Sequence, residues 1–180
     1  DRHLALASEA IQCAATTVET WVVWNANGVA TTQIFQLDKS YGADGMVVKP
    51  GITKIAELKG KTMAADAPGT AGYFGLAWIL KKNGMSVKDV KVVNMGPQPA
   101  ANAMIAGTDG IDGAMTYEPY LSAVRAKPEA GKIIATTLDY PMVMDTVGCA
   151  PTWLKANPKA AKALADSYFA ALDMIKAEPA

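Results

Sequence analysis

Hydrophobic and polar positions along the chain form short apolar runs that alternate with longer periodic segments. Short runs rich in Val, Ile, Thr and Met predict strands over residues 31–37, 46–49, 61–65, 90–93, 113–116, 133–136 and 142–149. Apolar positions three and four apart predict helices over residues 17–27, 70–83, 99–106 and 158–176. Strands that alternate with helices predict an α/β fold with a mostly parallel sheet.

Glycine and proline mark the ends of these predicted elements. Gly28 and Gly84 each follow a predicted helix, where glycine tolerates the left-handed conformation that ends many helices. Pro119 suits the first residue of a helix after residues 113–116. Residues 40–45 form a cluster of turn residues, so the strands at 31–37 and 46–49 are expected to form an antiparallel pair.

Composition removes several classes of function. The 180 residues include 17 Lys+Arg and 17 Asp+Glu, which give a net charge of zero, and 51% of the residues are hydrophobic. Without a positive charge excess, a nucleic-acid partner is not expected. No apolar run approaches the ~18 residues of a membrane span, so a soluble chain is expected. One histidine and two cysteines cannot build a zinc cluster, and no metal, cofactor or hydrolytic site is expected.

The loop that precedes the predicted helix at 70–83 is a candidate ligand site. In open parallel sheets, ligands bind beyond the carboxyl ends of strands. Gly69 and Thr70 stand where backbone N–H groups at the start of a helix could approach an anion. A structural alternative is equally open: Thr70 caps the helix, and Gly72 and Gly75 permit close packing.

A second candidate loop follows the predicted strand at 113–116. Thr116, Tyr117 and Glu118 put a hydroxyl, an aromatic ring and a carboxylate at the end of a strand. In the structural alternative, Glu118 compensates the dipole of the next helix and Tyr117 packs. His3 is the only histidine and is far from these loops, so no Ser/His/Asp nucleophile is expected.

Three segments, taken in order, resemble a known family. The segments are residues 40–48 (SYGADGMVV), residues 55–61 (IAELKGK), and residues 103–107 (AMIAG) followed by 112–119 (DGAMTYEP). They are similar to the periplasmic solute-binding proteins of nitrate/sulfonate/taurine-type ABC transporters. Members of this family are longer at both ends. The resemblance therefore implies a two-lobed, Venus-flytrap (type II periplasmic-binding) α/β fold with an incomplete first lobe.

The resemblance also implies how the lobes and the binding residues are arranged. Lobe one would comprise residues 1–50 and 142–180, and lobe two residues 51–141. The resemblance assigns hydroxyl, acidic, aromatic and glycine residues to the binding cleft between the lobes. They are Thr16, Thr17, Ser40, Asp44, Gly69, Thr70, Thr116, Tyr117, Glu118 and Asp145. The layout would make the strands of Cys13 and Cys149 potential neighbours, which would allow a disulfide.

The function implied by the resemblance is solute capture without turnover. A small anionic or zwitterionic solute (nitrate, alkanesulfonate or taurine-like) would close the lobes, and an ABC permease in the inner membrane would read the closed form. An amino sulfonate with its amine toward Glu118 would suit both the helix N-terminus and the nearby carboxylates. A monomer in the periplasm, or outside the cell and tethered to the membrane, is expected.

Three alternatives stay open from the sequence. One is an enzyme or precursor-binding protein of the same fold that acts on a pyrimidine-type compound. Another is the effector-sensing domain of a regulator, which would need a DNA-binding module before Asp1. The third is an α/β domain whose loops only pack.

Overall fold

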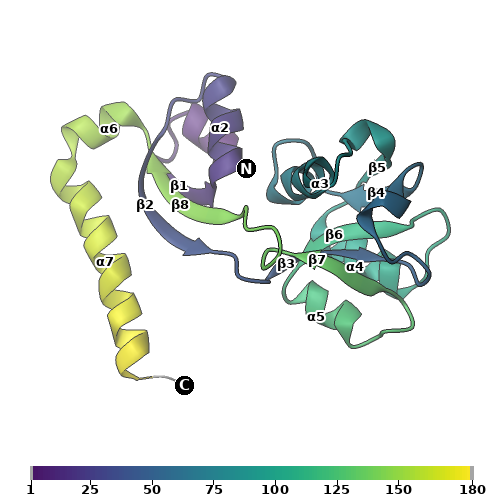
Figure 1. The fold of residues 1–180 in the computed structure, drawn as a ribbon. Helices are drawn as coiled ribbons and strands as arrows, with labels where there is room; N and C mark the ends of the chain where they lie inside the picture. The colour runs from purple at the N-terminus through teal and green to yellow at the C-terminus, as the bar shows by residue number, and fades with distance from the viewer. Residues whose placement is uncertain (1, 179–180) are drawn as a thin grey trace. The chain divides into compact units, whose positions relative to one another are not determined.

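The computed structural model describes residues 2–178 and divides into two compact units (Figure 1). Unit 1 comprises Asp1–Asp38 and Met144–Ala180, and unit 2 comprises Lys39–Val143. The chain therefore crosses between the units after Asp38 and after Val143. The first crossing lies 12 residues before the lobe boundary expected at 50/51, because the strand Asp44–Val48 pairs within the sheet of unit 2.

Unit 2 is built on a five-stranded sheet of order β5-β4-β6-β3-β7. In chain order its strands are β3 (Asp44–Val48), β4 (Thr62–Ala65), β5 (Lys91–Asn94), β6 (Gly113–Tyr117) and β7 (Lys132–Thr136). β4 is parallel to β5 and β6, whereas β3 is antiparallel to both β6 and β7. The α/β class is confirmed. Four of the five strands run in the same direction, and β3, between β6 and β7, runs in the reverse direction.

Helices cover both faces of this sheet (Figure 1). They are α3 (Ala71–Lys82), α4 (Pro97–Ile105) and α5 (Tyr120–Arg125), with short 3₁₀ turns at Ile55–Leu58 and Val87–Asp89. Side chains alternate along the strands: Met46 packs with Leu76 of α3, while its neighbour Val47 packs with Met104 of α4 and Leu121 of α5. Two apolar clusters, one on each face, therefore hold unit 2 together.

Within its described residues, 2–38 and 144–178, unit 1 contains a three-stranded sheet of order β1-β8-β2 and four helices. The strands are β1 (Cys13–Thr17), β2 (Thr32–Lys39) and β8 (Met144–Cys149). The helices are α1 (Arg2–Ala7), α2 (Val18–Ala26), α6 (Pro151–Ala156) and α7 (Pro158–Ala177). The expected antiparallel pair of residues 31–37 with 46–49 is wrong, because β2 and β3 belong to different sheets and residues 40–43 form the link between them.

A disulfide joins β1 to β8 within unit 1. Cys13 and Cys149 face each other across the antiparallel pair, with a Cα–Cα distance of 4.0 Å, and their sulfur atoms are bonded. The sequence left this bond open, and the structure shows it. Pro119 also differs from its expected place: it precedes α5, which begins at Tyr120, and the Glu118–Pro119 peptide is cis. Among residues 2–178, no helix is both long and apolar enough to cross a bilayer.

Candidate functional site

Polar side chains gather at one edge of the sheet in unit 2. Because β3 runs antiparallel to β6 and β7, its amino end meets the carboxyl ends of β4, β6 and β7 at the same edge, which we call the polar edge. Asp44 lies opposite Tyr117 in the register, and Gly45 lies opposite both Thr116 and Thr136. Seven expected site residues belong to this edge or its loops: Ser40, Asp44, Gly69, Thr70, Thr116, Tyr117 and Glu118.

Ser40 and Asp44 are part of a hydrogen-bond network within unit 2. The Ser40 hydroxyl donates to Oδ2 of Asp44 (2.5 Å) and lies 2.8 Å from the Thr137 hydroxyl. The backbone N–H of Gly42 donates to the same Thr137 oxygen (2.8 Å). These contacts fix the loop that leads into β3.

The start of α3 lies at the polar edge. Gly69 has a φ of +91°, a value that favours glycine, and turns the chain into Thr70. The Thr70 hydroxyl accepts a hydrogen bond from the backbone N–H of Tyr73 (3.4 Å), so Thr70 is the N-cap. A Cβ at Gly75 would lie 3.0 Å from Met115 Cε, which shows that this glycine serves close packing. The capping alternative is thus realised, and the helix N-terminus still presents a positive partial charge.

Thr116 and Tyr117 differ in their accessibility. Thr116 is buried, and its hydroxyl donates to the Pro97 carbonyl (2.9 Å). Tyr117 is 41% exposed and lies 5.8 Å, centroid to centroid, from the ring of Tyr120. Partial burial raises the pKa of Tyr117, and Tyr120 and the carboxylates of Asp66 and Asp44 raise that pKa further. The tyrosine hydroxyl therefore remains protonated near neutral pH and can donate a hydrogen bond.

The Glu118 carboxylate contacts groups of α5, the helix that follows it. Oε2 accepts from the Ser122 N–H (2.8 Å), and Oε1 pairs with Arg125 (3.1 Å). Burial acts to raise the pKa of Glu118, but the hydrogen bonds from Ser122 and the contacts with Arg125 outweigh it, and the pKa is lowered. These contacts match the helix-dipole alternative for Glu118.

The other three expected residues lie in unit 1. Thr16 is buried and faces Thr146, while Thr17 faces Asp145 across the β1–β8 pair. Thr17 precedes α2, and its hydroxyl lies 2.9 Å from that of Thr20. The structure thus brings these three residues together in unit 1 and the other seven together in unit 2.

Two residues of the polar edge were missed from the sequence. Asp66 directly follows β4, which is parallel to β6, so its place beside Tyr117 could have been expected from the strand pattern. Thr137 follows β7 and is only 1% exposed. No local signal in the sequence marks Thr137, because its partners in residues 40–44 are nearly one hundred positions away.

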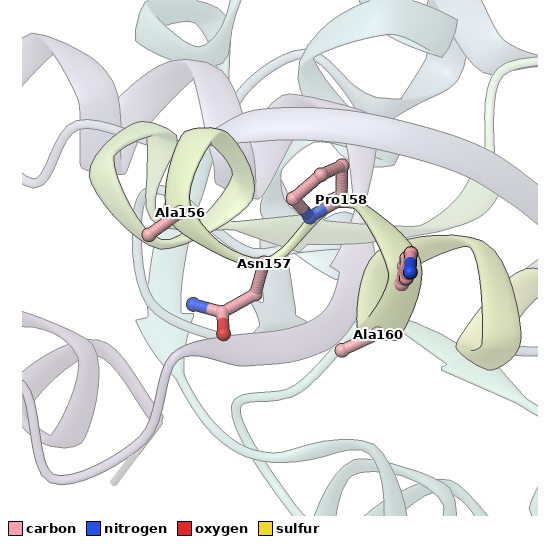
Figure 2. Close-up of a pocket in the computed structure, with 5 residues that line it drawn as sticks. Ala156, Asn157, Pro158 and Ala160 are labelled. Atoms are coloured by element: carbon pink, nitrogen blue, oxygen red, sulfur yellow. The ribbon is translucent and has the colours of Figure 1, made fainter.

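A surface hollow of about 430 Å³ lies elsewhere, in unit 1 where α6 meets α7 (Figure 2). It is lined by consecutive residues, Ala156 to Ala160. The Asn157 amide donates back to the Trp153 carbonyl (3.1 Å). The hollow is therefore the corner between two helices, and none of the expected site residues lies in it.

The arrangement of strands and helices is that of the periplasmic-binding-protein fold. The family model of the NMT1-like family matches residues 4–180, and the chain belongs to this family. The resemblance to solute-binding proteins of nitrate/sulfonate-type transporters is thereby confirmed at the level of family and fold. A comparison with curated proteins found no match.

Solved structures share the fold along nearly the whole chain. A putative periplasmic sulfonate-binding protein SsuA from Methylobacillus flagellatus KT is 24% identical, with a TM-score of 0.77, and the match covers 96% of this chain and 52% of that one. The aliphatic sulphonate-binding SsuA of Escherichia coli is 18% identical, with a TM-score of 0.78, and the match covers 97% of this chain and 56% of that one.

The alkanesulfonate-binding SsuA of Xanthomonas axonopodis pv. citri, solved with MOPS bound, is 18% identical, with a TM-score of 0.80. The match covers 97% of this chain and 60% of that one. The chain thus spans little more than half the length of these three proteins. At these identities the likeness shows the periplasmic-binding-protein fold.

Proposed function

We propose that the protein is the solute-binding component of an ABC importer, acts in the periplasm and delivers a small polar anionic or zwitterionic solute to a permease. The observation that carries this proposal is the polar edge of unit 2, where hydroxyl, carboxylate and helix N-terminal groups meet at strand ends. Both chain crossings also leave unit 2 beside this edge, at residues 39 and 143. The protein binds its solute and does not transform it.

The charges at the polar edge favour a zwitterion over a simple anion. The start of α3 attracts a negative group such as a sulfonate or carboxylate. Asp44 and Asp66 lie close enough to Tyr117 to raise its pKa, so two carboxylates stand near the same place. A bare anion would be repelled by them, whereas an amino sulfonate or amino acid would also have a cation to offer.

Asp66, rather than Glu118, is the partner that we propose for the cationic group. Glu118 already accepts hydrogen bonds from Ser122 and Arg125, which offset part of its charge. Asp66 is half-buried at the end of β4, and one of its oxygens accepts from the N–H of Ala67 (2.7 Å). Its second oxygen has capacity for a further donor.

Solute binding would be coupled to movement of the two units. A solute that contacts residues of both units stabilises the arrangement in which both contacts form, by the difference in its affinity for the two arrangements. The permease would then bind the solute-loaded form.

Calorimetric titration with a solute panel tests this function. The panel contains taurine, ethanesulfonate, nitrate, glycine and a pyrimidine, and heat of binding is expected for the zwitterions. A saturating ligand should also raise the free energy of unfolding by ~3 kcal/mol at about a hundredfold over Kd. Binding of the pyrimidine alone, or of no compound, would contradict the proposal.

Asp66→Asn separates the cationic contact from the rest of the site. The variant is expected to weaken taurine binding at least about tenfold, because a charge-assisted contact to a half-buried carboxylate is lost. Ethanesulfonate binding should stay unchanged or become stronger, because a charge that repels the anion is removed. Glu118→Gln, the matched control on the next loop, should weaken both ligands equally or not at all. A loss of taurine binding in Glu118→Gln with none in Asp66→Asn would instead assign the amine to Glu118.

A further inference from the structure

The two segments that leave unit 2 are anchored in different ways. The segment before Met144 is held by the core: Met142 and Val143 are buried in the apolar cluster under α3, and the Tyr140 hydroxyl accepts from the Asn83 amide (2.9 Å). The segment after Asp38 has no such anchor. None of its residues 39–43 is buried, and Tyr41 is 83% exposed.

Hydrogen bonds to Thr137 and Val143 hold residues 39–43, the first crossing segment, in place. The backbone N–H of Ser40 donates to the Val143 carbonyl (3.0 Å), which joins the two crossing segments directly. The Gly42 N–H donates to the Thr137 hydroxyl, and the Thr137 N–H donates to the Asp44 carbonyl (3.0 Å). The loop is thus fixed on three sides.

The hydroxyl protons of Ser40 and Thr137 determine which of the two residues donates in the contact between them. Ser40 has one hydroxyl proton, and it is donated to Asp44, so the 2.8 Å contact between Ser40 and Thr137 must use the Thr137 proton. Thr137 therefore donates to Ser40 and accepts from Gly42 at once. Its side chain is 1% exposed, so water cannot readily replace either bond.

We infer that Thr137 is a positioning residue that pins the first crossing segment, residues 39–43, to the end of β7, and so supports the Ser40–Val143 bond that makes the two crossings act as a single pivot. Without the pin, the bond from the Ser40 N–H to the Val143 carbonyl would be the direct link left between the two crossing segments, and the joint between the units would gain freedom. This role concerns the protein without solute and goes beyond the proposed binding function. Its test needs no ligand, so the two proposals can fail separately.

Hydrogen exchange of the ligand-free protein tests the pin. Thr137→Val keeps the shape of the side chain and removes both its bonds. Exchange of the Ser40 and Gly42 amides is expected to accelerate about five- to tenfold, the change expected for the loss of roughly one net hydrogen bond. Thr137→Ser keeps the hydroxyl and should restore slow exchange. A joint that is not pinned by Thr137 would show the same exchange in all three proteins.

A matched control and a second readout separate pinning from general destabilisation. Thr116→Val removes another buried hydroxyl of the same sheet edge, which bonds Pro97 instead. It should leave exchange at residues 39–43 unchanged. Spin labels placed by Lys88→Cys in unit 2 and Lys155→Cys in unit 1 should report a broader distance distribution for Thr137→Val than for Thr116→Val. Equal distributions in the two variants would overturn the inference, as would fast exchange in both.

Discussion

Several carboxylates of unit 2 accept hydrogen bonds from backbone N–H groups close to them in the chain. The hydrogen bond from the Thr53 N–H is the largest cause that lowers the pKa of Glu57, and the bond from the Ser86 N–H does the same for the pKa of Asp89. For Glu118, burial opposes the shift, yet the bonds from Ser122 and Arg125 lower the pKa. Each bond favours the charged carboxylate, so these residues stabilise the fold only while they are ionised.

Glu118→Gln should reduce the loss of unfolding free energy that occurs as the pH falls into the acid range. A folded-state pKa below the usual 4.5 means that the Glu118 contribution is present above pH ~4.5 and is lost as the pH falls through the lowered value. We expect the variant to be less stable than the natural protein at pH 7 and to approach it near pH 3. Urea unfolding at several pH values measures this. Glu129→Gln, in an exposed turn, is the control and should keep the full pH dependence.

The candidate site could be predicted only where a local signal exists. Tyr117 and Glu118 follow a clear strand, and Thr70 precedes a clear helix, so their place at strand and helix ends was visible in the sequence. The partners of these residues were not. Whether Glu118 is available to a ligand depends on Ser122 and Arg125, and the role of Ser40 depends on Thr137, a contact that spans 97 positions.

At the scale of single elements, glycines set how closely strands and helices approach. A Cβ on Gly113 of β6 would lie 2.8 Å from the Val47 carbonyl oxygen of β3 and 2.7 Å from Met63 Cε of β4. The methionine could move, but the backbone oxygen could not without opening the sheet. At Gly72 of α3, the nearest atoms are at 3.7 Å, which is ordinary contact.

Gly113→Ala is therefore expected to destabilise unit 2 by about 1–3 kcal/mol, the usual cost of overpacking. Gly72→Ala, the matched control, should be neutral or stabilising by less than about 1 kcal/mol, because alanine favours the helix. Chemical denaturation of both variants, followed through Trp78 of α3, measures the difference. Equal stability of the two variants would show that the sheet adjusts to an added methyl group.

The positions of helices and strands could be predicted from the sequence, while the pairing of the strands in the two sheets could not. The uninterrupted apolar run Met46, Val47 and Val48 marks a strand buried on both faces, and Thr70 and Gly84 delimit α3 within a residue or two. Strand direction depends on where the chain goes next. Residues 40–43 have the composition of a hairpin turn, yet they carry the chain from one sheet to another. Nothing local distinguishes these two uses of the same residues.

At the scale of the whole chain, the two units are stabilised by different means. Both apolar clusters found among the described residues lie within unit 2. In unit 1, α7 buries none of its described side chains, and Leu164, Phe169, Met174 and Ile175 are each at least 40% exposed. The Cys13–Cys149 bond lies in this unit. We therefore expect the disulfide to supply a large share of the stability of unit 1.

Replacing both cysteines, Cys13→Ala with Cys149→Ala, tests this dependence. When unit 1 unfolds alone, unit 2 stays folded, and the hydrogen bond between Ser40 and Val143 (3.0 Å) keeps the two ends of unit 2 close together. The disulfide then closes an effective loop of about thirty residues of unit 1, and it should contribute roughly 3–4 kcal/mol to the stability of that unit. Amides of β1 and β8 should then exchange much faster, while those of β4 and β6 keep their protection. Equal acceleration in both units would mean that the whole chain unfolds as one, and no acceleration would mean that strand pairing alone holds unit 1.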